Sequence, residues 1–209
     1  MIKEQNKNML INQNDKIIHF RNKLWNKNLD IPKWVNKNNV DLDQFYTKPE
    51  IAEKCYISLK KFLQKEKVNE SHFKFVEPSA GTCAFYNLLP KNRRIGIDLI
   101  PNKKEIIKQD FLSWQPKKNG YDYITIGNPP FGYRAWLALI FLNHAAKFSK
   151  YVGMILPMAF QSEGKSSAKH RVRGLKLISS EVLPQDSFQD VNGKTVKVNA
   201  LWQIWERGE

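Results

Sequence analysis

The 209-residue chain contains few of the residues that build metal sites and disulfide frameworks. Its two cysteines, Cys55 and Cys83, and its four histidines are spread along the sequence without the short spacing that metal ligands require. We therefore predict no metal site and no disulfide scaffold. The scarcity of cysteine is typical of a reducing, intracellular compartment, so we expect a cytoplasmic location in a bacterial cell or in the host cell of a phage or virus. No apolar run approaches the roughly 20 residues that span a bilayer, and no secretory signal is visible.

Acidic residues are scarce relative to basic ones. The chain has 34 Lys and Arg residues against 20 Asp and Glu residues, which gives a formal net charge of +14 at pH 7. A charge of this size and sign indicates a polyanionic partner, and nucleic acid is the leading candidate. An AT-biased genome, which favours Lys and Asn codons, is an alternative explanation of the composition.

The sequence divides into a leader and one folded domain. Residues 1–40 are rich in Asn and Lys and carry a net charge of +5. We interpret this leader as a mostly disordered segment with one docked helix, and alternatively as a basic arm that contacts nucleic acid or a partner. The amphipathic helix is predicted around Ile17, Ile18, Phe20, Leu24 and Trp25. Residues 41–209 form the folded domain.

Hydrophobic patterns in the folded domain alternate between strand and helix. Thr47 and Glu50 have the spacing of a capping box, Pro49 lies in the first turn, and the apolar residues that follow predict a helix to about residue 66. A second helix is predicted over residues 135–148. Seven strands are predicted over residues 73–76, 95–98, 106–112, 121–126, 151–156, 175–183 and 198–205. Four alternations of strand, loop and helix predict an α/β fold with a doubly wound sheet and a ligand crevice at its carboxyl edge.

Polar residues follow the first strands of this pattern. The strand at 73–76 leads into a loop of small residues, 77–83, which we predict to open a helix and to let backbone approach a ligand. Asp98 ends the next strand about 20 residues after the loop, the spacing at which a carboxylate reaches ribose hydroxyls. Asp110 and Phe111 end the third strand with an acid and a ring.

The most specific signal is the tetrad Asn128-Pro129-Pro130-Phe131, which follows the strand at 121–126. Two consecutive prolines fix φ and remove two backbone donors, so the tetrad forms a rigid shelf. The side-chain oxygen of Asn128 and the carbonyl of Pro129 can accept the two hydrogens of a planar amine, whose lone pair is then free to attack. Phe131 offers an exposed ring on which an extruded base can stack. An accidental strand-ending turn is the alternative.

A second concentration of positive charge lies in residues 161–176, which contain five basic residues and one acid. Small residues in this segment predict a mobile loop beside the crevice. We interpret it as a loop that neutralises substrate phosphates, with a solvated surface loop as the alternative. The basic residues are Lys165, Lys169, Arg171, Arg173 and Lys176.

In this order, the motifs resemble those of S-adenosylmethionine-dependent amino-methyltransferases of nucleic acids. The resemblance covers roughly residues 42–207. It implies a class I, Rossmann-like methyltransferase fold whose seven-stranded sheet is mostly parallel, with one antiparallel strand near the C-terminus. It also implies S-adenosylmethionine as cofactor, the N6 amine of adenine as target, and residues 41–209 as the catalytic domain. The implied catalytic residues are Asn128, Pro129, Pro130 and Phe131. The implied cofactor-binding residues are Phe45, Tyr46, Thr47, Pro49, Glu77, Pro78, Ala80, Gly81, Asp98, Asp110, Phe111 and Asn128.

Two features depart from the family pattern. Cys83 stands where the family loop usually has a second glycine, so we expect weaker cofactor binding. Only 78 residues follow Phe131, and no separate target recognition domain is evident. DNA is slightly favoured over RNA as the substrate, and a protein partner or a homodimer could supply target recognition. An RNA adenine methyltransferase and a non-catalytic, nucleic-acid-binding subunit of a methyltransferase complex remain as alternatives. Contacts to nucleic acid are expected from Lys165, Lys169, Arg171, Arg173 and Tyr133.

Overall fold

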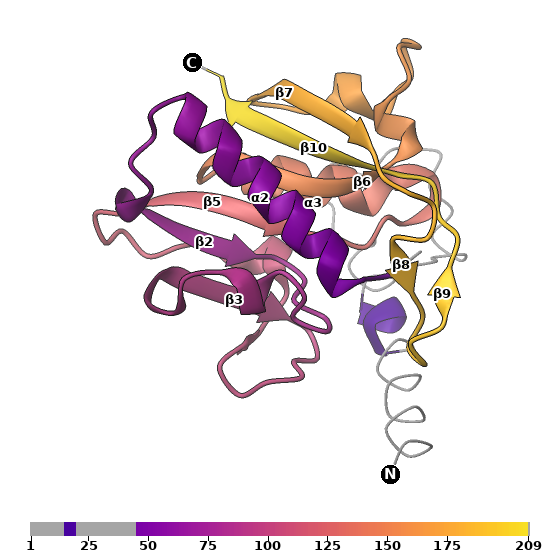
Figure 1. Ribbon diagram of the computed structural model, residues 1–209, viewed down its shortest axis with the longest axis horizontal. Helices are drawn as coiled ribbons and strands as arrows, with labels where there is room; N and C mark the ends of the chain where they lie inside the picture. Colours follow the sequence, from indigo (N-terminus) through magenta and orange to yellow (C-terminus); the bar gives the residue numbers. More distant parts are fainter. Residues whose placement is uncertain (1–14, 20–44, 209) are drawn as a thin grey trace.

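A seven-stranded sheet forms the centre of the molecule, which we describe from a computed structural model that covers residues 15–19 and 45–208 (Figure 1). Its strands are β2 (Phe73–Glu77), β3 (Arg94–Asp98), β4 (Ile107–Lys108), β5 (Asp122–Gly127), β6 (Ser149–Pro157), β7 (Leu175–Val182) and β10 (Ala200–Arg207). They lie in the order β4-β3-β2-β5-β6-β10-β7. The order reverses beside β2, because β3 and β4 lie on one side of it and β5 and β6 on the other.

The strand directions agree with the predicted sheet. All neighbouring pairs from β4 to β6 are parallel, whereas β10 is antiparallel to both β6 and β7. In open α/β sheets a ligand crevice forms outside the carboxyl ends of the strands, at the point where the strand order reverses. The prediction of a doubly wound, seven-stranded, mostly parallel sheet with one antiparallel strand near the C-terminus is therefore confirmed.

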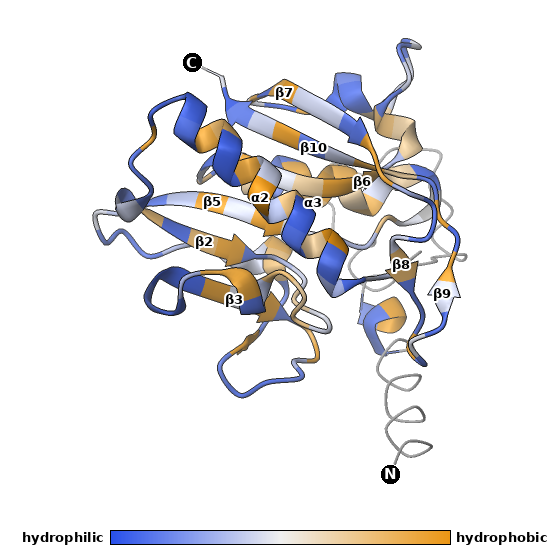
Figure 2. Cartoon of the chain, viewed as in Figure 1, coloured by the Kyte–Doolittle hydropathy of each residue, from blue (hydrophilic) through white to orange (hydrophobic). Residues whose placement is uncertain are grey.

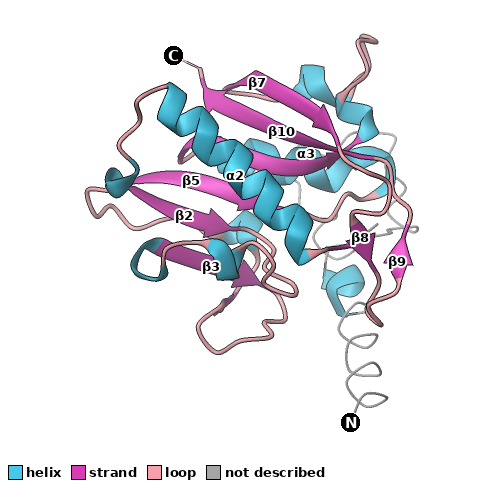
Figure 3. Ribbon diagram, viewed as in Figure 1, coloured by secondary structure: helices cyan, strands magenta, loops and turns pink. Residues whose placement is uncertain are grey.

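Helices are fewer than the sequence pattern predicts. Within residues 45–208 the α-helices are α2 (Pro49–Lys65) and α3 (Trp136–Ala145), and the connections from β2 to β5 consist of loops and short 3₁₀ turns (Figure 3). The predicted fourfold alternation of strand, loop and helix is therefore wrong. The helix expected after the loop at 77–83 is a 3₁₀ turn, Tyr86–Leu88, because Pro90 prevents its extension.

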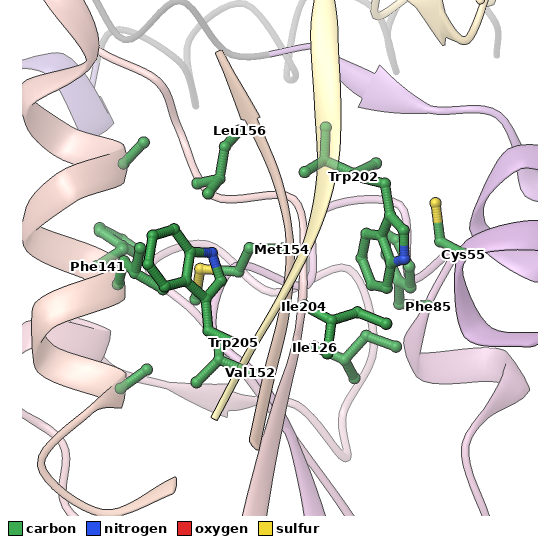
Figure 4. Packing of buried hydrophobic residues seen from close by; sticks show 14 of the residues in the cluster. Cys55, Phe85, Ile126, Phe141, Val152, Met154, Leu156, Trp202, Ile204 and Trp205 are labelled. Carbon is green, nitrogen blue, oxygen red and sulfur yellow. The ribbon is translucent and has the colours of Figure 1, made fainter. Parts of the chain in front are cut away.

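Packing on both faces buries the central strands. Met154 of β6 lies on the same side of the sheet as Phe141 of α3, whereas Trp202 of β10 points to the opposite side, towards Cys55 of α2 (Figure 4). The Trp202 side chain is 1% exposed and stacks on Phe85 with ring centroids 6.2 Å apart. Hydrophobic residues follow the strands, while much of the surface of α2 is hydrophilic (Figure 2). The amphipathic pattern of α2 is thus explained by one buried face.

A second, small sheet covers the start of α2. It consists of β1 (Tyr46–Thr47), β8 (Phe188–Gln189) and β9 (Thr195–Val196), in the order β1-β8-β9. Residues 183–199 leave the main sheet after β7 and form the central strand β8 and the outer strand β9 of this small sheet. The Lys48 N–H donates to the Ser187 carbonyl at 3.0 Å, and the buried ring of Phe188 lies 6.2 Å from that of Phe45. The last part of the chain therefore fixes the segment that precedes α2.

Several local boundaries differ from the predictions. Thr47 does not cap α2: it belongs to β1, and the N-cap residue is Lys48, whose side chain makes no capping hydrogen bond. The strand predicted over 106–112 shortens to β4, and the segment that follows Asp110 is a 3₁₀ turn, Phe111–Ser113.

The ends of the helices are closer to expectation. The end of α2 at Lys65 confirms the predicted boundary, whereas α3 ends at Ala145, earlier than predicted. In the leader, residues 15–19 are helical, and the rest of the predicted leader helix lies outside the described residues. In residues 15–19 and 45–208, every helix is too short or too polar to cross a membrane.

The contact between Gly153 and Trp202 tests the packing of the sheet. A Cβ added at Gly153 would lie 2.5 Å from Cη2 of Trp202. Gly153→Ala is expected to lower the free energy of unfolding by about 1–3 kcal/mol, because overpacking would displace the buried indole. Urea denaturation measures the change. Gly164→Ala, in a loop with room for a Cβ, is the control, and an equal effect of the two variants would contradict the packing.

Candidate active site

Polar side chains gather where the parallel strands end. Glu77 and Asp98 are the last residues of β2 and β3, Asn128 directly follows β5, and Asp110 lies two residues after β4. Because the carboxyl ends of parallel strands meet at one edge of a sheet, these side chains surround the crevice expected at the reversal of strand order.

Two cavities lie at this edge. The acidic cavity, with an empty volume of about 290 Å³, is lined by Lys16, Pro78, Ser79, Asp98, Leu99, Gln109, Asp110, Phe111, Pro130 and Phe141. The amide cavity, with an empty volume of about 260 Å³, is lined by Phe45, Tyr46, Thr47, Glu77, Ser79, Ala80, Gly81, Thr82, Ala84, Phe85 and Asn128. Ser79 lines both, so the cavities adjoin across the loop that follows β2.

Hydrogen bonds fix this loop to the end of β3. The Ala80 N–H donates to the Ile97 carbonyl at 3.0 Å, and the Gly81 N–H donates to Oδ2 of Asp98 at 2.8 Å. Gly81 has a φ of 48°, in the left-handed region that glycine adopts without strain. A Cβ at Gly127 would lie 3.2 Å from Cδ of Pro78, so this second glycine allows the end of β5 to approach the loop.

Cys83 keeps the backbone of a glycine position. Its φ is 65°, in the left-handed region that glycine adopts without strain. Its side chain packs with Tyr86 and Ile106 and does not line either cavity. Burial, with a smaller contribution from the nearby charge of Glu77, raises the pKa of the Cys83 thiol to about 11. Weaker cofactor binding because of Cys83 stays a prediction.

The two acids of the acidic cavity are held in defined orientations. Oδ1 of Asp98 accepts from the Ile100 N–H, and Oδ1 of Asp110 accepts from the Leu112 N–H, each at 2.9 Å. Two basic side chains from residues 15–19 also reach them. Nζ of Lys16 lies 2.9 Å from Oδ1 of Asp98, and Nε2 of His19 lies 3.0 Å from Oδ2 of Asp110. The ring of Phe111 packs beside these groups and is buried.

The amide group of Asn128 is oriented by β1 and the residue before it. Its Nδ2 donates to the Phe45 carbonyl at 2.8 Å and to Oγ1 of Thr47 at 3.0 Å. Because a carbonyl can only accept, the nitrogen must face Phe45 and the oxygen must face away. Among the described residues, nothing donates a hydrogen bond to Oδ1 of Asn128, which is buried. A buried acceptor without a donor costs about 1–3 kcal/mol, so a ligand N–H at this position would be favourable.

The other residues of the tetrad form the wall of the site. Pro130 lines the acidic cavity, whereas Pro129 and Phe131 line neither cavity. The prediction that Phe131 offers an exposed ring is wrong: the side chain is 5% exposed and packs edge-on against Phe45, with ring centroids 6.1 Å apart. The aromatic surroundings of β1 explain this burial. A catalytic role for Phe131 stays a prediction.

The backbone after the tetrad is strained. Arg134 and Ala135 have φ values of 51° and 64°, which side chains with a Cβ rarely adopt, and Gly132 has a φ of 69°. Strain of this kind often accompanies functional segments that change conformation. The backbone of Tyr133 belongs to the same 3₁₀ turn, Tyr133–Ala135, and its side chain lies outside the described part of the structure.

Glu77 is the least compensated acid of the site. It is 2% exposed, and its Oε2 accepts a hydrogen bond from the Tyr86 N–H at 2.8 Å. Burial raises the pKa of Glu77 well above its ordinary value of 4.5; the Tyr86 N–H opposes this shift, and the nearby charge of Asp98 adds to it. The carboxylate therefore gains from a cationic group in the amide cavity.

The structure brings together most of the residues predicted to bind a cofactor. All of them except Pro49 line one of the two cavities, with the acids Asp98 and Asp110 in one and Asn128 in the other. Sequence reasoning missed Lys16 and His19. No local signal marks them, because their partners lie far along the chain. Within the described residues, no group of three or more His, Cys, Asp or Glu side chains is arranged to hold a metal ion.

The predicted phosphate-binding segment lies apart from the linings of both cavities. It contains a 3₁₀ turn, Ala168–Arg171, in place of the simple loop that was expected. Asn143 of α3 holds this segment: its Nδ2 donates to the Arg171 carbonyl at 3.1 Å, and its Oδ1 accepts from the Arg173 N–H at 2.9 Å. Lys169 forms an ion pair with Glu163. Lys165 is exposed.

Known structures share this fold at low sequence identity. A Pyrococcus horikoshii protein provisionally assigned as an RNA methyltransferase aligns over 80% of this chain and 88% of its own, with 17% identity and a TM-score of 0.55. The modification subunit of a provisionally assigned type I restriction enzyme from Vibrio vulnificus aligns over 80% of this chain and 45% of its own, with 13% identity and a TM-score of 0.52.

A magnesium protoporphyrin IX methyltransferase from Synechocystis PCC 6803, solved with bound SAM, also has a similar structure. It aligns over 77% of this chain and 79% of its own, with 12% identity and a TM-score of 0.51. No family model and no curated protein sequence matches the chain. The chain therefore has the class I methyltransferase fold.

The raised pKa of Glu77 predicts a pH dependence of stability. The folded state holds the proton at pH values where the unfolded state has lost it, so stability falls as the pH rises from about 4.5 through the folded pKa. Glu77→Gln keeps an oxygen acceptor for Tyr86 and removes the buried charge. We expect it to raise the free energy of unfolding relative to the unmodified chain above pH 4.5, by about 1.4 kcal/mol for each pH unit up to the folded pKa.

Urea denaturation between pH 5 and pH 8 measures this difference at roughly one-unit intervals. Glu53→Gln, which replaces an exposed acid on α2, is the matched control and should leave the pH slope unchanged. A Glu77→Gln protein with the slope of the unmodified chain would show that Glu77 is not a buried, high-pKa acid.

Proposed function

We propose that the protein transfers a methyl group from S-adenosylmethionine to the exocyclic amine of adenine in nucleic acid. The observation that carries this proposal is the amide of Asn128, whose two hydrogens are held by Phe45 and Thr47 and whose buried oxygen has no donor among the described residues. An oxygen fixed in this way is a preorganised acceptor for an amine hydrogen, and it stabilises the positive charge that develops on the nitrogen.

The two adjoining cavities suit the two ends of the cofactor. In the acidic cavity, Asp98 would hold ribose hydroxyls, and Asp110 with Phe111 would contact the base. In the amide cavity, the carboxylate of Glu77 would pair with the ammonium of the methionine part. When bound, S-adenosylmethionine supplies an activated methyl group. The residues of this chain would position the amine, exclude water and favour its pyramidal form.

The adenine amine must reach Oδ1 of Asn128, which is buried in this structure. The strained turn at Tyr133–Ala135 directly follows the tetrad, so a change in its backbone is the simplest route to an opening. Phe131 and Phe45 would then separate and leave a ring face for the extruded base. Catalysis in this scheme rests on position and electrostatics, and it assigns no side chain as an obligatory general base.

Nucleic acid is the substrate class that the charge and the comparisons support. The chain carries a net charge of +14, and basic residues occupy the segment around residues 165–173. Two of the similar structures, the Pyrococcus and Vibrio proteins, are assigned to RNA methylation and to the modification subunit of a restriction enzyme. The Synechocystis enzyme, named for a porphyrin substrate, shares the fold as well, so the fold alone does not select the substrate.

RNA is a second candidate substrate, and the Pyrococcus neighbour is the observation that favours it. DNA was slightly preferred on the sequence alone, and the residues of the site recognise an adenine amine in either polymer.

A non-catalytic subunit is less consistent with the site, because Asp98, Asp110 and Asn128 are all present and oriented by hydrogen bonds. We propose that a protein partner or a second copy of the chain contributes to target recognition in either case.

Asn128→Ala tests the central role of the amide. We expect methyl transfer to fall by about 100-fold or more, because the acceptor for the amine is lost. Affinity for S-adenosylhomocysteine should stay within a few-fold. Transfer of a tritium-labelled methyl group to double-stranded DNA, single-stranded DNA and structured RNA measures activity and identifies the polymer, while calorimetry measures affinity.

A milder substitution, at Thr47, tests the orientation of the Asn128 amide without removing the amide itself. Thr47→Val preserves shape and removes one acceptor from the Asn128 amide, so transfer should fall by roughly 5- to 10-fold. Asn87→Ala, at an exposed position outside both cavities, is the control and should retain full activity. Equal losses of transfer and cofactor affinity in Asn128→Ala would show that Asn128 is structural.

Neutralising Lys169, Arg171 and Arg173 tests the proposed phosphate contacts. The triple substitution to Gln should weaken binding to nucleic acid and reduce the slope of log K against log salt by about 0.9 for each lost contact to B-DNA. Lys169→Gln alone should have a smaller effect, because Lys169 is paired with Glu163. Fluorescence anisotropy at several salt concentrations measures the slope. An unchanged slope would remove this segment from the binding surface.

A further inference from the structure

The helical residues 15–19 lie against the acidic cavity, although they are more than 75 residues away in sequence from the acids they contact. Lys16 lines the cavity together with Asp98, Asp110 and Phe111. Its side chain is 9% exposed, and that of Asp98 is 1% exposed. A lysine at this depth is uncommon without a paired charge, and Asp98 supplies that charge.

The hydrogen bonds of Asp98 leave little capacity for a ligand. Each carboxylate oxygen has about two acceptor positions. Oδ1 accepts from the Ile100 N–H and from Nζ of Lys16, each at 2.9 Å, and Oδ2 accepts from the Gly81 N–H at 2.8 Å. A ribose diol held in a bidentate manner requires one position on each oxygen. Lys16 therefore takes the position on Oδ1 that the diol needs.

A second contact, between His19 and Asp110, engages the other acid of the cavity. Nε2 of His19 lies 3.0 Å from Oδ2 of Asp110, whose Oδ1 accepts from the Leu112 N–H. The His19 side chain is 41% exposed and does not line the cavity, whereas the Lys16 side chain is 9% exposed and does line it. Both acids that the nucleoside of the cofactor would contact are thus engaged by one short segment.

We propose that residues 15–19 are an internal competitor of the cofactor: Lys16 must leave Asp98 before an adenosine-containing ligand binds. This inference rests on the proposed function, because it takes S-adenosylmethionine as the ligand of the acidic cavity. Residues 15–19 are then part of a switch with two states. In one state Lys16 pairs with Asp98 at the cavity, and in the other state the ligand occupies the cavity.

Affinity of the 209-residue chain for S-adenosylhomocysteine tests the competition. This probe lacks the sulfonium charge, and its ammonium and carboxylate groups balance, so loss of a lysine should change its binding little through net charge repulsion. Lys16→Ala is expected to bind S-adenosylhomocysteine about 5- to 30-fold more tightly. Loss of the Lys16–Asp98 ion pair increases the fraction of the protein whose acidic cavity is open to the ligand. Lys118→Ala makes the same change of charge at an exposed position and should leave the affinity unaltered. Titration calorimetry gives both values.

Hydrogen exchange on the unmodified chain gives a test that needs no substitution. Saturating S-adenosylhomocysteine should increase deuterium uptake in the peptide that covers residues 15–19, because that helix leaves the cavity. Reduced or unchanged uptake would overturn the proposal, since it would mean that the segment closes over the ligand or ignores it. Unchanged or weaker affinity of Lys16→Ala would overturn it as well.

The outcomes distinguish this inference from the proposed function. If neither protein binds S-adenosylhomocysteine or S-adenosylmethionine, the cofactor assignment is wrong and the competition falls with it. If both proteins bind with equal affinity, the competition is wrong and the cofactor assignment stands. Tighter binding by Lys16→Ala together with increased exchange at residues 15–19 would establish the competition.

Discussion

The orientation of one amide group depends on most of the architecture. The Phe45 carbonyl and the Thr47 hydroxyl hold the nitrogen of Asn128, so its oxygen has a fixed direction. Those two partners are positioned by the small sheet in which β1 pairs with β8. Residues 183–199, which could have been a plain connection between β7 and β10, instead supply β8 and the buried ring of Phe188. Residues 183–199 thus help to determine the orientation of Asn128 at the end of β5.

Most strands of the main sheet could be predicted from the sequence, whereas the strands of the small sheet and the connections could not. Strand predictions succeeded because short β-branched and aromatic runs are bounded by Pro, Gly and charged residues, and because the central strands are buried on both faces. The helices expected between β2 and β5 rested on the analogy of alternating units. Pro90 limits the helix after the loop that follows β2, short 3₁₀ turns and loops take the place of the helices, and the sheet forms without them. Element order was therefore more predictable than element type.

The candidate site shows the same division at the level of single residues. Asp98, Asp110 and Asn128 could be found because strand ends converge whatever connects the strands. Thr47 was assigned to a capping box, since Thr and Glu three residues apart fit that pattern, but its hydroxyl is used by Asn128, 81 residues away. Lys16 has no local signature at all. Its role depends on a contact with Asp98 that only the folded chain reveals. Sequence reasoning locates groups at ends of elements, and it misses the long-range partners that orient them.

The distribution of charge links the two kinds of ligand in the proposed function. The protein as a whole is strongly cationic, yet Glu77, Asp98 and Asp110 are buried at one edge of its sheet. Buried carboxylates require donors or cations, and the three differ in what they receive. Asp98 has two backbone N–H groups and Lys16, Asp110 has one N–H group and His19, and Glu77 has the Tyr86 N–H and a raised pKa. A ligand with a cationic group gains most beside Glu77, and a ligand with a diol must displace the cation beside Asp98. In the proposed function, S-adenosylmethionine carries both features and the polyanion would be attracted to the outer surface, so the two ligands would bind without competition between them.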